Sequence, residues 1–309
     1  MHQIKVFAPA SVANVSCGFD VLGFAVHRPG DLVEMQLNDS GLVHLDRVEG
    51  DEGRLPRATE KNIVSAVVIN YLEHLGVKQG VSITLKKQMP FGSGLGSSSA
   101  SAVAGLVAIN ELMGKPMTRE ELLPFAMEGE RLASGNAHAD NVAPALLGGL
   151  VLIRSYEPLD VVRLPYPDTL CVALVYPHVE IPTMAARKII KSSITMKNAI
   201  KQWGNVGGLV AGLCTNNMDL ISRSMEDVIV EPIRAMLIPM FYEMREHALN
   251  NQALGFGISG SGPTVFALCD DMGKASNIAS LLHTLLERSG IESTTYVSDI
   301  NQEGPVVVE

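Results

Sequence analysis

The sequence predicts a two-domain protein of the α+β class. In the first half of its 309 residues, strand-like alternation of apolar residues gives way to long helical patterns, and a loop of glycines and serines joins one such strand to one such helix. In the second half, helical segments again precede and follow short apolar strands. Prolines cluster between residues 155 and 168, and we place the boundary there, with domains at residues 1–162 and 163–309.

The composition narrows the functional classes. With 47% hydrophobic and 18% charged residues, the chain is globular. The net charge of −9, without a run of Lys or Arg, argues against a nucleic-acid partner. The first 30 residues lack the unbroken apolar core of a signal peptide, and no run approaches the ~18 apolar residues of a membrane span. We therefore expect a cytoplasmic protein with no membrane association. The four scattered cysteines form no CxxC pair, which argues against a disulfide framework or a zinc site.

The N-terminal segment presents two polar turn residues. Strand patterns at residues 4–6 and 21–26 flank a turn at 8–20, which carries Asn14 and Asp20. A turn Asn or Asp usually bonds its own backbone, and for each residue that interpretation has even odds with a functional one.

The sheet pattern continues to residue 45, and a helix follows at residues 61–76. Asn62 stands near the start of this helix, where a side-chain oxygen can cap the first turn. Capping alone would account for this residue.

The strongest functional signal is the stretch PFGSGLGSSSAS, which runs from Pro90 to Ser101 between a strand at 81–85 and a helix at about 100–113. Its glycines allow positive φ values, so several N–H groups can point into one concavity. The helix adds its positive end at the same place, and the serines add hydroxyls for phosphate oxygens or a metal ion. A triphosphate such as ATP fits these features. The loop lacks the Walker lysine, and taken alone such a loop is as often a structural turn.

A carboxylate follows on the next helix. Thr118 and Glu121 form a capping box that opens it, and Glu130 falls on the same side as the apolar residues Ala126 and Met127. A carboxylate there needs a cation, which is either a basic side chain or Mg²⁺. We favour Mg²⁺, because a carboxylate and a serine hydroxyl of the neighbouring phosphate loop are the hard oxygen ligands that it takes.

Further polar residues gather in the loop at 136–141, after this helix ends at Gly135. The loop places His138, Asp140 and Asn141 within a few positions of each other. A loop His or Asp is commonly a turn residue, but three functional side chains beside a candidate metal ligand favour a site.

Two arginines stand out in the second half, both near apparent helix starts. Separately, Arg187 and Arg234 read as solvated surface charges. As a pair they could bind the carboxylate of a small substrate, because the guanidinium group favours that geometry. A second glycine-rich turn at 255–264 would join the first in lining a cleft with backbone.

Several motifs together carry a resemblance to a known family. PFGSGLGSSSASA resembles the phosphate-binding motif of the GHMP kinases, the superfamily of galactokinase, homoserine kinase, mevalonate kinase and phosphomevalonate kinase. Within it, the chain resembles the homoserine kinase family over nearly its full length and with the motifs in order. The stretches that carry this resemblance are APASVANVSCGFDVLGFA, NAHADNVAPALLGG, PTMAAR, EPIR and GISGSGPTVFAL.

The resemblance implies a GHMP kinase fold, with an N-terminal domain of the ribosomal protein S5 domain 2-like type and a C-terminal ferredoxin-like α/β plait. ATP and substrate would lie between the domains. Asn62 would lie near the adenine, and Ser98 and Glu130 would bind Mg²⁺. The residues that would hold the phosphates are Pro90, Phe91, Gly92, Ser93, Gly94, Leu95, Gly96, Ser97, Ser98, Ser99 and Ala100.

The implied substrate is L-homoserine, phosphorylated on its side-chain hydroxyl in threonine biosynthesis. Asn14 and Asp20 would contact its amino alcohol end, and Arg187 and Arg234 its carboxylate. His138 would lie on the substrate side of its loop. The candidate catalytic residues are Glu130, Asp140, Asn141 and Thr183. Two routes for the proton stay open, one to Asp140 as general base and one directly to phosphate.

One stretch departs from the family. After Arg187 the chain reads KIIKSSITMKNAI, where the family usually has a Leu-Pro pair and a more acidic stretch. The family also implies a homodimer, whose surface the sequence does not show. Two alternatives stay open, a GHMP kinase for another small alcohol and a nucleotide-binding relative without catalysis.

Overall fold

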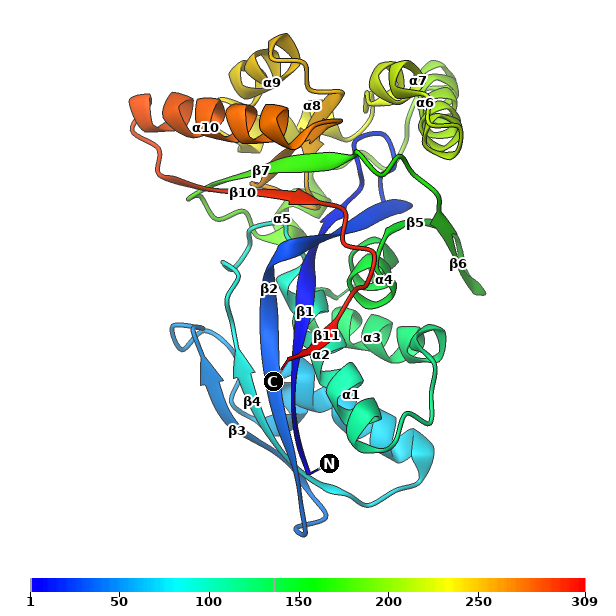
Figure 1. Ribbon diagram of the computed structural model, residues 1–309, viewed down its shortest axis with the longest axis vertical. Helices are drawn as coiled ribbons and strands as arrows, with labels where there is room; N and C mark the ends of the chain where they lie inside the picture. Colours follow the sequence, from blue (N-terminus) through cyan, green and yellow to red (C-terminus); the bar gives the residue numbers. More distant parts are fainter. Residues whose placement is uncertain (1, 136, 309) are drawn as a thin grey trace.

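Two β-sheets, stacked end to end and each covered by helices, make up the fold (Figure 1). The computed structural model describes residues 2–135 and 137–308. The first sheet has the strand order β11-β1-β2-β4-β3, and β5 pairs with both β2 and β6. Only the β3–β4 pair is parallel among the described ladders. The strands are β1 (Gln3–Ala13), β2 (Leu22–Asn38), β3 (Val43–Glu49), β4 (Gly80–Lys86), β5 (Leu150–Tyr156), β6 (Leu159–Leu164) and β11 (Val306–Val308).

Four helices cover this sheet: α1 (Ile63–Leu75), α2 (Ser97–Leu112), α3 (Arg119–Ser134) and α4 (Ala139–Leu147), with a short 3₁₀ turn, η1 (Thr59–Lys61), before α1. Helix α2 lies at the centre, against β1, β2 and the other three helices. It is apolar on all sides and buried from Ser99 to Asn110, as expected of a helix enclosed by neighbours. The sheet and these helices therefore fix the position of the first residues of α2.

The second sheet has the order β10-β7-β9-β8, entirely antiparallel. With its crossover helices this is the ferredoxin-like α/β plait that the resemblance to the GHMP kinases implies. Its strands are β7 (Cys171–Pro177), β8 (Gly255–Ile258), β9 (Val265–Cys269) and β10 (Ser293–Asp299). Its helices are α5 (Thr183–Lys188), α6 (Met196–Cys214), α7 (Met218–Ser224), α8 (Glu231–Arg234), η2 (Ala235–Leu237), α9 (Phe241–Asn250) and α10 (Met272–Arg288).

One of two apolar core clusters joins the two sheets, and the other lies between the second sheet and its helices. Phe24 of β2 meets Phe266 of β9 edge to face, with ring centroids 6.3 Å apart. An isolated bridge pairs Val26 with Ile300. We keep the division at residues 162 and 163 as a proposal; β6 ends at Leu164, and β11 returns the chain to the first sheet.

The structure shifts several predicted elements. Strand β1 continues to Ala13 although it contains Pro9, because the register shifts between Pro9 and Ser11 and a proline fits such an irregularity. The predicted capping box on α3 is present, with Thr118 accepting from the Glu121 amide. Arg187 and Arg234 lie in the last turns of α5 and α8 rather than near helix starts. In the part of the chain that is described, no helix is long and apolar enough to cross a membrane.

Candidate active site

The glycine- and serine-rich loop leads directly into α2. Gly92, Gly94 and Gly96 have φ values of 61°, 80° and 70°, the left-handed conformation that the sequence predicts for them. Helix α2 begins at Ser97, three residues earlier than expected, so Ser97, Ser98 and Ser99 form its first turn. Their hydroxyls thus stand beside the helix's unpaired N–H groups, which is the arrangement that binds phosphate.

The second glycine-rich turn holds this loop in place. The Ser259 hydroxyl donates to the Gly94 carbonyl at 2.8 Å, and the Thr264 amide donates to the Ser93 carbonyl at 3.1 Å. From the first sheet, the Ser11 amide donates to the Leu95 carbonyl at 3.1 Å. A Cβ on Gly94 would lie 2.4 Å from the Ser259 carbonyl oxygen. Backbone from both sheets therefore packs against the loop. Gly260 and Ser261 of the second turn also line the same cavity as the loop, as the sequence predicts for the two glycine-rich turns.

A buried ion pair behind the loop escaped the sequence analysis. Lys87 and Asp31 are almost fully buried and form a salt bridge. Lys87 also donates to the Ser97 carbonyl at 3.0 Å and to the Ser101 hydroxyl at 2.9 Å. Asp31 lies on β2 and Lys87 follows β4, so only the pairing of these strands brings them together. The pair ties the first turn of α2 to the sheet.

Glu130 meets the serines across the helix pair. Its carboxylate accepts from the Ser98 hydroxyl at 2.9 Å and from the Ser99 hydroxyl at 2.8 Å, and the residue is buried on α3. These oxygens suit Mg²⁺, which takes one or two protein ligands and completes its shell with phosphates and water. Within the described residues, no group of three or more His, Cys, Asp or Glu side chains could hold a metal ion. An ion here would depend on the nucleotide for the rest of its ligands.

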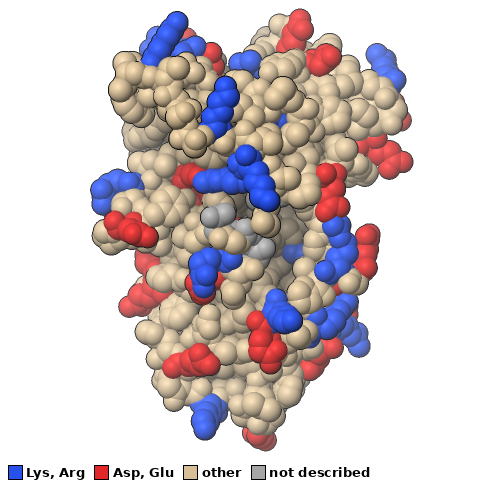
Figure 2. All heavy atoms as spheres, turned by 180° about the vertical axis from the view of Figure 1, so that it is seen from behind, with Lys and Arg blue, Asp and Glu red and all other residues tan. Residues whose placement is uncertain are grey.

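Ser98, Glu130 and most residues of the phosphate loop line a cavity of about 500 Å³. Asn62 lies on its wall and also caps α1, with its side-chain oxygen accepting from the Val64 amide at 3.1 Å. The capping interpretation of Asn62 is therefore correct. The side-chain nitrogen of Asn62 donates to the Pro56 carbonyl at 3.1 Å, and the residue remains part of the cavity wall. On the face opposite to that of Figure 1, Lys and Arg side chains gather around a hollow at mid-height (Figure 2). Of the loop residues predicted to hold phosphates, the cavity is lined by Pro90, Phe91, Gly92, Ser93, Gly94, Gly96, Ser97 and Ser98.

Three of the predicted nucleotide residues face elsewhere. Leu95 and Ala100 are fully buried in the core beneath the loop. Ser99 is also buried, where its hydroxyl reaches Glu130. Their contribution is to anchor the loop.

The turn after β1 is held in a strained conformation. Asn14, Val15 and Ser16 have φ values of 73°, 43° and 60°, and Asp20 has 58°. Positive φ is costly for residues with a Cβ, and such residues often occur at binding sites. Asn14 accepts from the Asp20 amide at 3.0 Å and donates to the Gly260 carbonyl at 2.8 Å. Asn14 therefore bonds within its own turn, as the turn interpretation predicts, and also reaches the second glycine-rich turn; these bonds fix the direction of Asp20.

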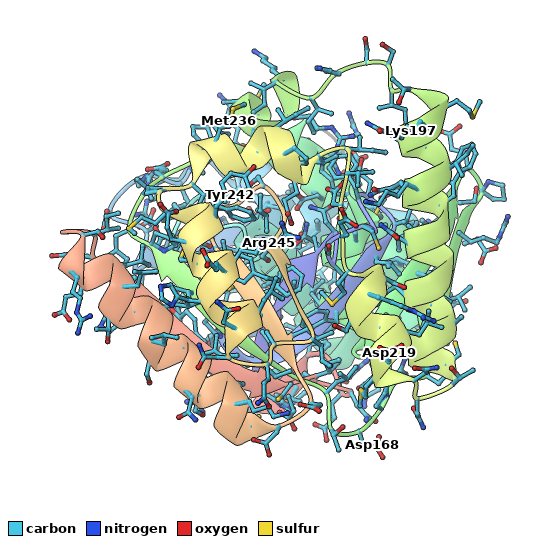
Figure 3. All side chains as sticks on the ribbon, turned by 90° about the horizontal axis from the view of Figure 1, so that it is seen from above. Asp168, Lys197, Asp219, Met236, Tyr242 and Arg245 are labelled. Carbon is cyan, nitrogen blue, oxygen red and sulfur yellow. The ribbon has the colours of Figure 1, made fainter. Side chains whose placement is uncertain are left out.

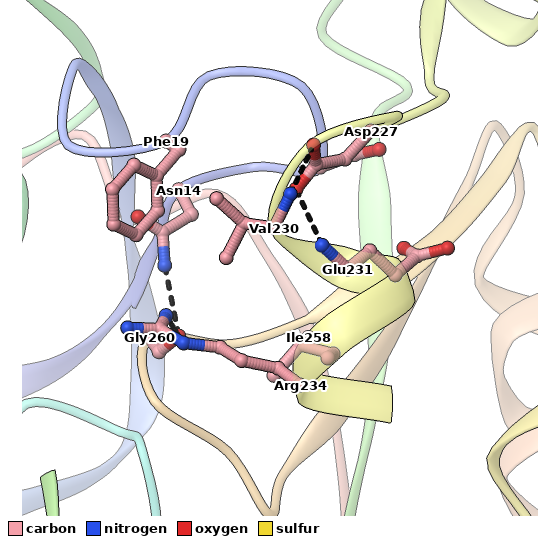
Figure 4. A pocket seen from close by; sticks show the side chains of 9 residues that line it. Asn14, Phe19, Asp227, Val230, Glu231, Arg234, Ile258 and Gly260 are labelled. Carbon is pink, nitrogen blue, oxygen red and sulfur yellow. Dashed lines mark hydrogen bonds between the residues drawn. The ribbon is translucent and has the colours of Figure 1, made fainter. Parts of the chain in front are cut away.

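Asp20 and the two arginines meet around one aromatic ring, Phe19. The carboxylate of Asp20 accepts two bonds from Arg187, at 2.8 and 2.7 Å. Arg187 and Arg234 both lie over the ring, with guanidinium carbons 5.0 and 5.1 Å from its centroid. Arg234 also donates to the Gly260 carbonyl at 2.7 Å, beside a small cavity of about 10 Å³ (Figure 4).

The surface interpretation of the arginines is wrong for Arg234, which is 4% exposed. Burial lowers the pKa of Arg234, whereas the hydrogen bond with Asp20 raises the pKa of Arg187. Phe19 was missed because an aromatic residue in a loop gives no signal of its ring's neighbours.

The loop after α3 brings titratable groups to the same place. Asp140 is buried in the first turn of α4, and its Oδ1 has no hydrogen-bond partner among the described residues. Burial, followed by the charges of Asp20 and Glu130, raises the pKa of Asp140 to about 8. His138 lies 3.8 Å from Asp20, and burial lowers the pKa of its imidazole. Tyr156 of β5, which the sequence analysis missed, donates to the Asp20 carbonyl at 2.7 Å.

Two further predicted residues complete the arrangement. Asn141 accepts from the Ser11 hydroxyl at 2.9 Å and lines the large cavity beside Gly96. Thr183 is the first residue of α5, and its side chain lies outside the described part of the structure. Residue 136 of the predicted loop also lies outside it.

Comparison with known proteins supplies the family. Residues 62–149 match the GHMP kinases N terminal domain, and residues 209–285 match the GHMP kinases C terminal domain. A homoserine kinase of Chloroherpeton thalassium is 48% identical, with 98% of this chain and 99% of that protein covered. The chain belongs to the homoserine kinase family. A relative in that family, from Chlorobium phaeobacteroides, is 46% identical over the full length of both chains.

Solved structures agree with this family and with its wider fold. The crystal structure of a homoserine kinase from Cytophaga hutchinsonii matches with a TM-score of 0.98 and 56% identity, covering 100% of this chain and 98% of that one. A mevalonate kinase structure matches with a TM-score of 0.71 at 14% identity, covering 97% of this chain and 99% of that one. At that identity the second match shows the shared GHMP kinase fold alone.

Proposed function

We propose that this chain is a kinase that transfers the γ-phosphoryl group of ATP to the side-chain hydroxyl of L-homoserine, and so serves threonine biosynthesis. The observation that carries the proposal is a pairing of opposite charges, Asp20 with Arg187 and Arg234, beside the cavity that the phosphate loop lines. His138 lines that cavity and lies 3.8 Å from Asp20, and Gly260 lines both this cavity and the small one beside Arg234. An amino acid carries both an ammonium and a carboxylate, so it matches this pair. Mevalonate and sugars lack the ammonium group.

The ion pair between Asp20 and Arg187 marks where each end of the substrate would bind. The substrate's ammonium would replace the guanidinium beside Asp20, and its carboxylate would replace Asp20 beside the two arginines. This exchange keeps every charge paired, so it avoids leaving an isolated charge in a half-buried site. Phe19 would hold both guanidinium planes during the exchange.

The chemical step would consist mainly of positioning and charge stabilisation. N–H groups of the phosphate loop and of the first turn of α2 would bind the phosphate oxygens. Ser98 and Glu130 would hold Mg²⁺, which supplies neutralisation of charge on the phosphates. The substrate hydroxyl would attack the γ-phosphorus as the bond to the β–γ bridging oxygen breaks, and its proton would pass to Asp140 or to the transferred phosphate.

The test measures ATP consumption by the purified protein with Mg²⁺ and, separately, L-homoserine, L-threonine, L-serine, mevalonate or galactose. We expect turnover with L-homoserine alone. Arg234→Lys keeps the charge but loses the planar fork, so KM for homoserine should rise at least tenfold while KM for ATP stays constant. Glu130→Gln should lower kcat by a factor of 100 or more and weaken the response to Mg²⁺.

Two results would contradict the proposal. Turnover with a different alcohol would reassign the substrate while keeping the kinase, and no turnover with any of them would favour a nucleotide-binding protein without catalysis. The proposal of a cytoplasmic location rests on the sequence pattern of the first 30 residues and on the lack of a long apolar run, and the proposal of a homodimer rests on the resemblance to the family.

A further inference from the structure

The outer side of α6 is apolar and faces solvent. Met196, Ile200 and Trp203 are 67%, 60% and 63% exposed. Monomeric proteins expose single apolar residues routinely, but several large ones on one helix face indicate an interaction surface. This surface begins in the segment after Arg187 in which the sequence departs from the family pattern.

The residues of this face share one side of the helix at ~3.6 residues per turn. Large side chains occupy its first half and small ones its second half. We call this set the α6 face: Met196, Ile200, Trp203, Gly204, Gly207, Ala211 and Cys214, all exposed. The helix carries two charged residues, Lys197 and Lys201, and both lie at the flank of the face. Lys201 pairs with Glu226 at 2.7 Å.

The glycines of α6 fall into two groups. A Cβ on Gly208 would lie 2.4 Å from the Ser224 hydroxyl, and one on Gly212 would lie 2.9 Å from Ile221, so the packing of α7 explains these two. A Cβ on Gly204 or Gly207 would meet nothing within 4 Å. Glycine in a helix interior costs about 1 kcal/mol relative to alanine. Contacts among the described residues explain the first two glycines and leave the second two without a packing reason.

We propose that the α6 face packs against the α6 face of a second copy of this chain, with the two helices antiparallel about a two-fold axis. An axis between Gly204 and Gly207 places Ile200 of each copy on Ala211 of the other, and Trp203 on the glycines that follow. Large residues then meet small ones throughout, and the glycines let the two backbones approach closely. A parallel pair would instead set large residues against large ones.

The charges at the ends of the hairpin also complement each other. Lys197 and Asp219 lie at opposite ends of the α6–α7 hairpin (Figure 3). Antiparallel pairing therefore brings Lys197 of each copy toward Asp219 of the other. The Asp219 side chain is 84% exposed and lies 3.6 Å from Arg223 of its own helix, a surface pair that leaves it accessible to a second cation. This self-complementarity is why we infer a second copy rather than an unrelated partner. The inference assigns a surface to the homodimer proposed above and does not depend on the phosphoryl transfer.

The first experiment replaces Gly207 by leucine and measures the monomer–dimer equilibrium by analytical ultracentrifugation. Open space around Gly207 means that Gly207→Leu fits the protomer, whereas it fills the space that the second helix needs. We expect the dimer dissociation constant to rise at least tenfold. Asn277→Leu is the matched control, because it adds the same side chain to the exposed face of α10. A wild-type monomer at all concentrations, or a dimer that Gly207→Leu leaves intact, would overturn the proposal.

The second experiment tests the orientation and does not need a disrupted dimer. Cys214 is exposed, whereas Cys17, Cys171 and Cys269 are buried. In the antiparallel pair, the two copies of Cys214 are about 25 Å apart along the helix axes, while Met196 of one copy adjoins Cys214 of the other. A bismaleimide that spans the about 8–10 Å between packed helices should therefore cross-link Met196→Cys and spare the wild type. Cross-linking of the wild type would exclude the antiparallel arrangement.

Homoserine-dependent turnover is assayed on the same samples. An inactive dimer that responds to Gly207→Leu would count against the proposed function and leave the surface assignment in place. An active protein that is a monomer at all concentrations would support the proposed function and contradict the surface assignment.

Discussion

Asp140 gives a prediction in which stability and catalysis can be separated. Its carboxyl group is buried, with a pKa of about 8 against an ordinary value of 3.8. Between about pH 4 and pH 8, the folded protein therefore holds a proton that the unfolded chain has released. The contribution of Asp140 to the free energy of unfolding is fully present below about pH 4. It is lost as the pH rises toward 8, by about 1.4 kcal/mol per pH unit. At pH 7 the loss amounts to about 4 kcal/mol.

Asp140→Asn should remove this cost, because the amide is similar in shape to the neutral carboxyl group and does not ionise. We expect the variant to be more stable than the wild type by up to about 4 kcal/mol at pH 7 and by less than half of that at pH 5. Urea unfolding without ligands at pH 5, 6, 7 and 8 measures the difference. Asp39→Asn, at an exposed position, is the control and should show no such trend. A difference for Asp140→Asn that does not change with pH would refute the reasoning.

The same variant distinguishes the two proton routes. If Asp140 accepts the proton of the substrate hydroxyl, Asp140→Asn should lower kcat by a factor of 10² to 10⁴, the usual contribution of general base catalysis, with KM little changed. If the proton passes directly to phosphate, kcat should fall by less than tenfold. Single-turnover measurement of phosphohomoserine formation decides between these outcomes.

Two further predictions concern the phosphate loop. Lys87→Met leaves Asp31 buried without its cation and should destabilise the protein by about 3–5 kcal/mol in urea unfolding; a change below 1 kcal/mol would count against the pair's role. Gly94→Ala forces a positive φ on alanine and a clash with Ser259. The free energy of unfolding should therefore fall by about 1–3 kcal/mol, which is measured as a lower melting temperature. A melting temperature of Gly94→Ala equal to that of the wild type would contradict this account.

The sequence predicted those parts of the site that depend on local chemistry. The Gly/Ser loop, the capping box of α3 and the inward direction of Glu130 follow from spacing along one or two elements, and the structure has all three. The start of α2 was placed too late because serine is a poor helix former in isolation, whereas here its hydroxyls bond to Glu130.

The missed residues depend on contacts between distant parts of the chain. Lys87 and Asp31 are 56 residues apart and meet through strand pairing. Phe19 contacts arginines that lie more than 160 residues further along, and Tyr156 of β5 bonds to the backbone of Asp20 in the turn after β1. No local pattern carries such information. The burial of Arg234 was likewise invisible, since a single arginine in a helix normally lies at the surface.

The contacts of the second glycine-rich turn have a consequence for how the chain could be divided. A fragment of residues 1–162 would contain the whole phosphate loop but would lose the Ser259 and Thr264 bonds to Gly94 and Ser93. Nucleotide affinity would then be a property of the intact chain and not of the half that holds the motif. Substitutions near Ser259, far along the sequence from the loop, should accordingly be detected first as weaker ATP binding.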